Sequence, residues 1–355
     1  MTKSSLRIMA ALLVTSFMCF TQAANAVSID KIVIFGDSLS DNGNILSLTR
    51  KAHRVFPSVP VIPKNPPYYE GRFSNGLNWV DNLAAGLDVP LLNYAYGGSW
   101  AEPLHDSKLM VPFGLGMQVD YYLVMAVADF HKDKHLYIIW AGGNDYVQGR
   151  EDAEYATTNT VASIASQIEW LVYYGAKNVM VMNLPDLSVV PEVQAQGPDS
   201  MQKVTKLVRM HNEKLAHMII EEKEKYPEAN LIFADITTYF DDVYQHPEKY
   251  EIKNVKSPCY GGDYSLRSLL NDRVATREIA AAKEQNIDIM NSPSLRAAYT
   301  TAKMADDGTG DVCATPDEYM FWDQIHPTRI IHQLMALDAA SILKKHDIDG
   351  AATVS

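Results

Sequence analysis

The chain has 355 residues, with 31 lysines and arginines against 43 aspartates and glutamates, so its formal net charge is −12. An acidic chain has no long-range attraction to nucleic acid or to anionic lipid. We therefore expect no nucleic-acid partner, and we expect any membrane contact to depend on local apolar surface. The length is sufficient for one large domain with a sizeable core.

The first predicted element is a signal peptide over residues 1–26. Two basic residues precede a nearly continuous apolar run from Ile8 to Phe20, and the Ala-Asn-Ala sequence ending at Ala26 fits a signal-peptidase site. The run is shorter than the roughly 20 residues that a transmembrane helix needs, although a retained membrane anchor is the alternative. We therefore expect a secreted or periplasmic protein whose mature chain, residues 27–355, is a single domain without a transmembrane segment.

Five short apolar segments then alternate with longer amphipathic patterns. The predicted strands are Lys31–Phe35, Leu91–Tyr94, His135–Trp140, Asn178–Asn183 and Asn230–Ala234, and the predicted helices include Asn78–Gly86, Gly116–Phe130, Glu154–Tyr174, Met201–Lys225 and Thr328–Lys345. Unbroken apolar strands that alternate with helices indicate a parallel sheet that is covered on both faces. We expect a doubly wound α/β fold, a three-layer α/β/α arrangement with a mainly parallel, flavodoxin-like sheet of about five strands.

Two segments interrupt this alternation. Residues 54–69 are rich in proline and aromatic residues, and we expect an ordered surface loop there. Residues 250–317 form a predicted insertion that contains Cys259 and Cys313, the two cysteines that remain after signal removal. An even pair in an oxidising compartment favours a disulfide, with two separate buried thiols as the alternative. Segment 306–311 lacks the ligand spacing of an EF-hand, and we predict no metal site.

Polar and glycine residues follow three of the predicted strands at the point where each strand ends. They are Gly36-Asp37-Ser38-Leu39, Gly97-Gly98-Ser99 and Gly142-Gly143-Asn144-Asp145. Functional groups in an open parallel sheet gather at the carboxyl ends of the strands, so all three segments should lie along one edge. Asp323 and His326 stand just before Pro327, a position typical of the first turn of a helix, and we expect them at the same edge.

This set of side chains suits nucleophilic catalysis by serine. A serine hydroxyl such as that of Ser38 needs an adjacent base, and the imidazole of His326 is suited to that task near neutral pH. A carboxylate such as Asp323 fixes the imidazole tautomer. The backbone N–H groups of Ser38 and Gly98 and the side-chain amide of Asn144 are candidate oxyanion donors, each worth about 3 kcal/mol.

The serine segment has other interpretations. Ser38 is also a suitable N-cap for a helix that begins near Asn42. A phosphate cradle has the same strand–turn–helix order, but the segment lacks the Lys-Ser/Thr of a Walker A sequence and the G-x-G-x-x-G of a dinucleotide site. A G-x-S-x-G elbow is also absent around Ser38, which argues against an ordinary α/β-hydrolase. We predict an enzyme without a cofactor.

The sequence resembles the SGNH, or GDSL, hydrolases. Four family blocks occur in order, namely FGDSLSDNGN, NYAYGGSWA, WAGGNDY and DQIHPT. The resemblance implies the SGNH hydrolase fold and a serine esterase mechanism. The roles it implies are nucleophile for Ser38, general base for His326, orienting carboxylate for Asp323, and oxyanion donors for Ser38, Gly98 and Asn144. Gly97 is the alternative to Gly98, since the two are adjacent.

A subgroup of this family suggests the substrate. The sequence looks like secreted bacterial phospholipases A, lysophospholipases and glycerophospholipid:cholesterol acyltransferases, in the segment after the first block and in its late cysteine pair. The resemblance implies an acyl ester of a glycerophospholipid or lysophospholipid, transient contact with a lipid surface, and water or a sterol such as cholesterol as acyl acceptor. We expect Phe56, Tyr68, Tyr69 and Phe113 to line an acyl groove, with burial in the core as the alternative for each.

Two other functions fit the same sequence. One is a carbohydrate O-acetylesterase, which shares the catalytic class. The other is a catalytically inactive binding module on the same fold, against which the intact serine, histidine and carboxylate set argues. The region bounded by the two cysteines is also a candidate lid over the site.

Overall fold

The structure is a computed structural model that describes residues 26–55, 61–102, 114–147, 152–262 and 310–350, with isolated positions between 277 and 284. The predicted signal peptide before Ala26, the groove candidates Phe56 and Phe113, and most of the segment between the cysteines lie outside these residues. Within the described ranges, no helix combines the length and the apolar composition that are needed to cross a membrane.

A parallel sheet forms the centre of the molecule. Its strands, in spatial order, are β3 (Leu91–Asn93), β2 (Lys31–Gly36), β4 (His135–Trp140), β5 (Asn178–Met182) and β6 (Asn230–Ala234). Every neighbouring pair is parallel. All residues of β4 and β5 are buried, because helices cover both faces, and this explains their largely apolar sequences. The five predicted strands are confirmed, with ends that shift by one residue at most.

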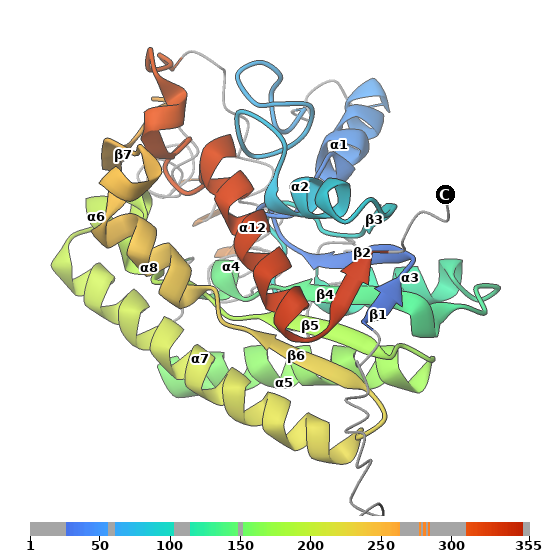
Figure 1. Cartoon of the computed structure of the whole chain (residues 1–355). Helices are drawn as coiled ribbons and strands as arrows, with labels where there is room; N and C mark the ends of the chain where they lie inside the picture. Colours follow the sequence, from blue (N-terminus) through green and yellow to red (C-terminus); the bar gives the residue numbers. More distant parts are fainter. Residues whose placement is uncertain are drawn as a thin grey trace, which may run out of the picture.

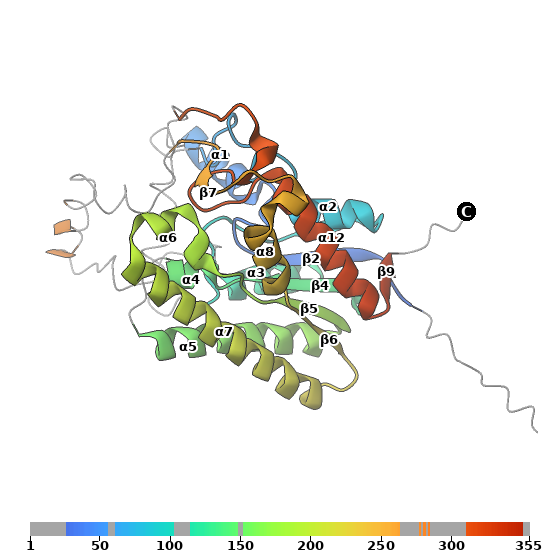
Figure 2. The ribbon, with the colours of Figure 1, turned by 60° about the vertical axis from the view of Figure 1, so that its left-hand side comes forward.

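Helices cover both faces of the sheet, as the two views of the ribbon show (Figures 1 and 2). On one face lie α3 (Leu115–Met125), α5 (Ala153–Tyr173) and the C-terminal part of α7 (Pro198–Lys225). On the other lie α2 (Trp79–Gly86), α8 (Thr237–Gln245) and α12 (Arg329–Lys345). Val33 of β2 packs within the first group and Ile34 within the second, as the two-residue period of a strand requires. The predicted three-layer α/β/α fold is confirmed.

Hydrophobic periodicity does not predict the remaining elements. They are helices α1 (Asn44–Val55), α4 (Gly143–Val147) and α6 (Pro191–Ala195), 3-10 turns at Lys132–Lys134, Leu187–Val189, Pro247–Tyr250 and Pro316–Glu318, and the parallel strand pairs β1 (Val27–Ile29) with β9 (Ile348–Gly350) and β7 (Asn254–Pro258) with β8 (Tyr319–Phe321). Most of these elements are too short for a period to be recognised. The β1–β9 pair brings the two ends of the described chain together (Figure 1).

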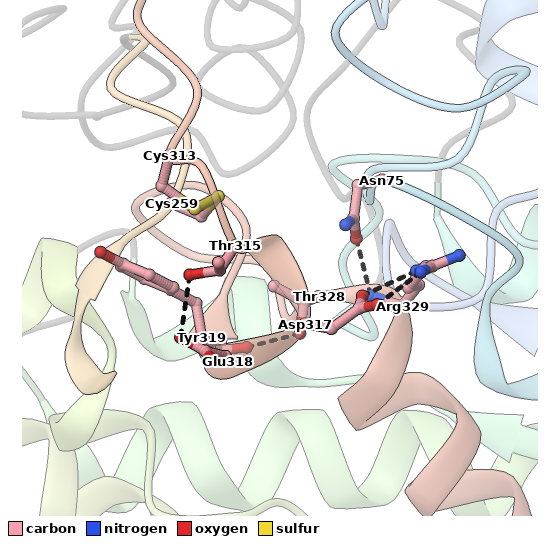
Figure 3. Close-up of a disulfide and its surroundings, with 9 residues drawn as sticks. All are labelled: Asn75, Cys259, Cys313, Thr315, Asp317, Glu318, Tyr319, Thr328 and Arg329. Atoms are coloured by element: carbon pink, nitrogen blue, oxygen red, sulfur yellow. Dashed lines mark hydrogen bonds and ion pairs between the residues drawn. A yellow bond between two sulfur atoms is a disulfide. The ribbon is translucent and has the colours of Figure 1, made fainter. Parts of the chain in front are cut away.

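A third, smaller core lies outside the layers and contains the cysteine pair. Cys259 and Cys313 form the expected disulfide, across a sequence separation of 54 residues (Figure 3). The ring of Tyr260 stacks on the indole of Trp322, with centroids 5.6 Å apart. The buried members of this core are Ile45, Ile62, Tyr68, Phe73, Cys259, Tyr260 and Trp322. They come from α1, from the proline-rich segment and from both sides of the disulfide, so the cluster fastens three distant parts of the chain together.

Candidate active site

The first part of the site is the turn that follows β2. The backbone oxygen of Asp37 accepts the N–H groups of Ser40 and Asp41, and the Asp37 carboxylate accepts the N–H of Leu39. This tight turn holds Ser38 at the end of the strand, where the residue is 8% exposed. Helix α1 is capped by the carboxylate of Asp41, which accepts N–H groups from the first residues of the helix. Capping of α1 is therefore the task of Asp41, and the alternative role of Ser38 as a cap does not hold.

Ser38 and His326 meet across 288 positions of sequence. Nε2 of His326 lies 2.8 Å from Oγ of Ser38, and both residues are buried. On the other side of the imidazole, Nδ1 lies 2.8 Å from Oδ2 and 3.0 Å from Oδ1 of Asp323. A serine hydroxyl, an imidazole and a carboxylate in this order and at hydrogen-bond distance form the arrangement of a serine hydrolase triad.

The carboxylate of Asp323 is buried and fully engaged. Its Oδ1 accepts the backbone N–H groups of Ile325 at 2.8 Å and of His326 at 2.7 Å. Its Oδ2 accepts the hydroxyl of Tyr68 at 2.7 Å. Burial alone would raise the pKa of Asp323, but the charge and hydrogen bond of His326 and the two N–H donors outweigh burial and lower that pKa below its ordinary value. The group is therefore held as a carboxylate beside the imidazole.

Tyr68 lies in a different place from the one expected for a groove residue. Its side chain is only 1% exposed and packs edge-on against Phe73, Tyr260 and Trp322. The hydroxyl points to Asp323 instead of to solvent. The core alternative is the correct one for this residue, since a ring so deeply buried offers no surface to an acyl chain. Tyr69 is 39% exposed, and its ring faces the guanidinium of Arg72 at 6.0 Å.

The segment after Tyr68 fixes the loop that carries His326. The ring of Phe73 lies against the imidazole, with centroids 5.0 Å apart. The hydroxyl of Ser74 donates to the backbone oxygen of Pro327 at 2.9 Å. The side-chain oxygen of Asn75 accepts the N–H of Arg329 at 2.7 Å, at the start of α12 (Figure 3). These contacts hold the histidine loop in place from residues more than 250 positions earlier in the chain.

The second strand-end segment distinguishes between the two adjacent glycines. The N–H of Gly97 donates to Oδ2 of Asp41 at 2.8 Å, so it is already engaged. Gly98 has a φ of 79°, a conformation that favours glycine. Within the described residues, the N–H groups of Gly98 and Ser38 have no hydrogen-bond acceptor. Gly98 is therefore better suited than Gly97 to donate to a bound group.

The third strand-end segment contributes an amide. Nδ2 of Asn144 donates to the backbone oxygen of Ser99 at 2.8 Å, which ties this side chain to the glycine segment. One of the two amide hydrogens is used in that bond, and the second remains for another acceptor. The next residue, Asp145, is buried and accepts the N–H groups of Ala101 and Glu102. Burial raises the pKa of Asp145 to about 7. Asn144 and Asp145 thus join the third strand-end segment to the second one and to the residues that directly follow it.

A buried glutamine that the sequence analysis did not identify joins the first two strand-end segments. Gln118 of α3 accepts the N–H of Gly36 and donates to the oxygen of Gly36 and to Oγ of Ser99, each at 2.8 Å. The polar residue interrupts an otherwise apolar helix face, which is the signal that was available. Among the described residues, no group of three or more histidine, cysteine, aspartate or glutamate side chains is arranged to hold a metal ion.

Comparisons with known proteins identify the family of the chain. Residues 32–339 match the family described as GDSL-like Lipase/Acylhydrolase. The phosphatidylcholine-sterol acyltransferase of Aeromonas hydrophila is 27% identical over 328 residues, which are 91% of this chain and 93% of that protein. The thermolabile hemolysin of Vibrio parahaemolyticus and the secreted effector protein SseJ of Salmonella typhimurium are each 26% identical over 87% and 90% of this chain, which spans 62% and 64% of their lengths. The chain belongs to the GDSL-like lipase/acylhydrolase family.

Proposed function

We propose that the protein is a secreted serine esterase that cleaves acyl esters of glycerophospholipids or lysophospholipids through an acyl-enzyme. The observation that carries the proposal is the 2.8 Å contact between Ser38 Oγ and His326 Nε2, with Asp323 on the opposite ring nitrogen. In this assignment Ser38 is the nucleophile, His326 the general base and Asp323 the carboxylate that holds the imidazole tautomer.

The reaction begins when Ser38 Oγ attacks the acyl carbonyl carbon and His326 Nε2 takes the hydroxyl proton. The carbonyl oxygen becomes an oxyanion, and its proposed donors are the N–H groups of Ser38 and Gly98 and the amide of Asn144. Collapse breaks the bond to the glycerol oxygen, which receives the proton from His326. A water molecule, or a sterol hydroxyl, then gives its proton to His326 and attacks the acyl carbon. The bond from that carbon to Ser38 Oγ breaks, Oγ takes the proton from His326, and a fatty acid or a sterol ester is released.

The relatives support a lipid substrate. The relative from Aeromonas hydrophila, which aligns over 93% of its own length, is named for phosphatidylcholine and for transfer of an acyl group to a sterol. Hydrolysis and transfer require the same residues here, because His326 activates whichever hydroxyl attacks the acyl-enzyme. Acceptor binding decides between them. We propose hydrolysis as the basic activity and transfer to cholesterol as the additional one.

The test is a product analysis with the purified mature protein. Phosphatidylcholine, lysophosphatidylcholine and an acetylated polysaccharide are incubated separately, each with and without cholesterol, and fatty acid, cholesteryl ester and acetate are quantified. We expect fatty acid from the lipids and none with Ser38→Ala. Acetate without fatty acid would replace the proposal with the carbohydrate O-acetylesterase. Failure of a fluorophosphonate probe to label the wild type would support the inactive binding module.

Export is part of the proposal. Residues 1–26 have the pattern of a signal peptide, and one of the relatives is named a secreted effector. Cleavage after Ala26 leaves a mature chain that begins at Val27, which is also the first residue of β1. We therefore expect the exported protein to start at Val27, as intact-mass measurement would determine. An exported protein that retains residues 1–26 would contradict this assignment.

A further inference from the structure

Helix α1 carries a concentration of positive charge that the net charge of −12 conceals. Its sequence, NILSLTRKAHRV, contains Arg50, Lys51, His53 and Arg54 and no aspartate or glutamate. All four basic side chains are exposed. Within the described part of the chain, Arg50, Lys51 and Arg54 take part in no ion pair and no side-chain hydrogen bond. Helix α7 also carries lysines without an ion pair, but it has aspartates and glutamates along its length, whereas α1 has three such cations and no acidic residue.

The same three cations border a hollow in the surface. The hollow has a volume of about 400 Å³ and is lined by Arg50, Lys51 and Arg54, together with the uncharged residues Gly43, Leu46 and Ser47 at the start of the helix. Its lining also includes Glu70, whose carboxylate lies 4.0 Å from the guanidinium of Arg72 and is partly neutralised by it. The hollow therefore presents mainly positive charge, and its volume is large enough for a phosphate group.

This helix is rigidly joined to the proposed nucleophile. Its first turn is capped by Asp41, three residues after Ser38, and the amide of Asn44 donates to the backbone oxygens of Asn93 and Ala95. On its inner side, Thr49 exchanges hydrogen bonds with the backbone of Ile62. The cations begin six residues after the start of the helix, about 9 Å along its axis. A surface that contacts these cations would consequently have a fixed orientation relative to the Ser38 turn. Figure 1 shows α1 at the outer margin of the molecule.

We propose that the basic face of α1, formed by Arg50, Lys51 and Arg54, docks the enzyme on a negatively charged phospholipid surface. The inference rests on the proposed lipid substrate and adds to it a surface and a charge preference. Charge complementarity identifies the occupant, because a phosphodiester headgroup offers the anion that unpaired guanidinium and ammonium groups bind. At about 0.1 M salt the Debye length is about 10 Å, so cations that touch the surface are attracted while the more distant carboxylates are screened.

The proposal differs from the expectation that membrane contact depends on apolar surface alone. That expectation followed from the total charge of the chain, and total charge does not describe a surface a few residues wide. Each Lys or Arg near an anionic bilayer strengthens binding by about fivefold. Three such residues should therefore strengthen binding by about a hundredfold.

The test measures binding without hydrolysis. Mature protein carrying Ser38→Ala is sedimented with vesicles of phosphatidylcholine, or of phosphatidylcholine mixed with phosphatidylglycerol. The parent should bind the mixed vesicles preferentially, and the binding should weaken as salt is raised. The triple variant Arg50→Gln/Lys51→Gln/Arg54→Gln should lose about a hundredfold of the affinity for mixed vesicles. The control, Lys203→Gln/Lys206→Gln/Arg209→Gln, changes the net charge equally on exposed residues of α7 and should bind as the parent does.

Equal losses in the two triple variants, or equal binding to both kinds of vesicle, would overturn the proposal. A role of the cations in helix stability alone is recognised by a lower melting temperature with unchanged vesicle binding, which also overturns it. Failure of the proposed function has a different signature. In that case Ser38→Ala protein still docks in a charge-dependent way, while the wild type releases no fatty acid from the same vesicles.

Discussion

The hydroxyl of Tyr68 donates a 2.7 Å hydrogen bond to Oδ2 of Asp323, the oxygen that also lies 2.8 Å from Nδ1 of His326. The carboxylate is therefore held from three sides, by the tyrosine, by the imidazole and by the backbone N–H groups of its own loop. Tyr68 touches no reacting atom in the proposed mechanism. It is a positioning residue, which keeps the carboxylate in the plane where it can orient the imidazole.

Removal of this hydroxyl should slow the chemical step. We expect Tyr68→Phe to lower kcat by about tenfold with little change in KM, because a hydrogen bond to a charged group is lost while the ring packing is kept. The measurement is steady-state hydrolysis of a p-nitrophenyl ester, with the active fraction determined by fluorophosphonate titration. That titration separates a slower site from a misfolded one.

The matched control removes the same kind of bond at a distant place. The hydroxyl of Tyr250 donates to Asp242 at 2.6 Å, in the region of α8. Tyr250→Phe should leave kcat unchanged. If both variants lose activity equally, or if Tyr68→Phe retains full kcat at full active fraction, Tyr68 has no positioning role.

Gln118 is expected to affect stability and activity together. Gln118→Leu removes three hydrogen bonds and leaves the buried N–H of Gly36 without the Gln118 oxygen as its acceptor, while the oxygen of Gly36 keeps only the N–H of Tyr96 at 3.2 Å. We expect the free energy of unfolding to fall by about 2–4 kcal/mol, and kcat to fall by about tenfold because the serine turn loses its link to Ser99. Denaturant unfolding and ester hydrolysis measure the two effects.

A second buried glutamine provides the comparison. Gln167 of α5 is also buried, but its amide donates a long hydrogen bond of 3.4 Å to the backbone oxygen of Ser163 within its own helix. Gln167→Leu should lower the free energy of unfolding by less than about 1 kcal/mol and should leave kcat unchanged. If the two substitutions lower the free energy of unfolding and kcat by similar amounts, the link that Gln118 makes between Gly36 and Ser99 has no special effect.

The fold could be predicted because the strands are buried on both faces. Each strand is a short apolar run, and the polar residues that follow it lie at the edge where the strand ends, so segments 36–39, 97–99 and 142–145 could be placed together without long-range information. Asp323 and His326 were equally accessible to prediction, since three positions on one loop place their side chains side by side.

The support of the site could not be predicted in this way. Tyr68 reaches Asp323 across 255 positions and Gln118 reaches Gly36 across 82, and no local pattern encodes such contacts. An aromatic residue in a proline-rich segment looks like part of an exposed loop, and this is why Tyr68 was assigned to a groove. A helix near Asn42 was expected only from its possible cap, and the extent of α1 could not be predicted because most of its residues are polar and its buried side, around Ile45 and Thr49, is narrow.

Asp37 should make stability depend on pH. Burial is the main cause that raises its pKa from the ordinary 3.8 to about 6, against opposing contributions from the N–H of Leu39 and the charge of His326. Between these two values the folded protein binds more protons than the unfolded chain. The contribution of Asp37 to stability is therefore complete below about pH 4 and is lost as pH rises through about 6, with a magnitude on the order of 3 kcal/mol.

The substitution Asp37→Asn should remove this dependence. An asparagine keeps the shape and can still accept the N–H of Leu39, but it does not ionise. We expect the loss of unfolding free energy between about pH 4 and about pH 7.5 to be smaller in Asp37→Asn than in the wild type, as urea unfolding would measure. Asp199→Asn, at an exposed aspartate in the first turn of α7, should retain the wild-type slope. Identical slopes for wild type and Asp37→Asn would contradict the assignment.

The disulfide should stabilise both the fold and the site, because of where it is placed. Cys259 and Cys313 close a loop with a sequence separation of 54, so reduction should lower the free energy of unfolding by about 4 kcal/mol. Tyr260, the neighbour of Cys259, packs edge-on against Tyr68 with centroids 5.8 Å apart. Loosening of the bridge should therefore also weaken the hold of Tyr68 on Asp323 and lower kcat.

Denaturant unfolding and ester hydrolysis, each with and without dithiothreitol, measure the two effects of the bridge. The double variant Cys259→Ser/Cys313→Ser should behave like the reduced wild type and should not respond to the reductant. That variant separates the loss of the bridge from any direct effect of the thiol reagent. Reduced protein with the unfolding midpoint and the kcat of the oxidised form would show that the aromatic core holds Tyr68 without the bridge.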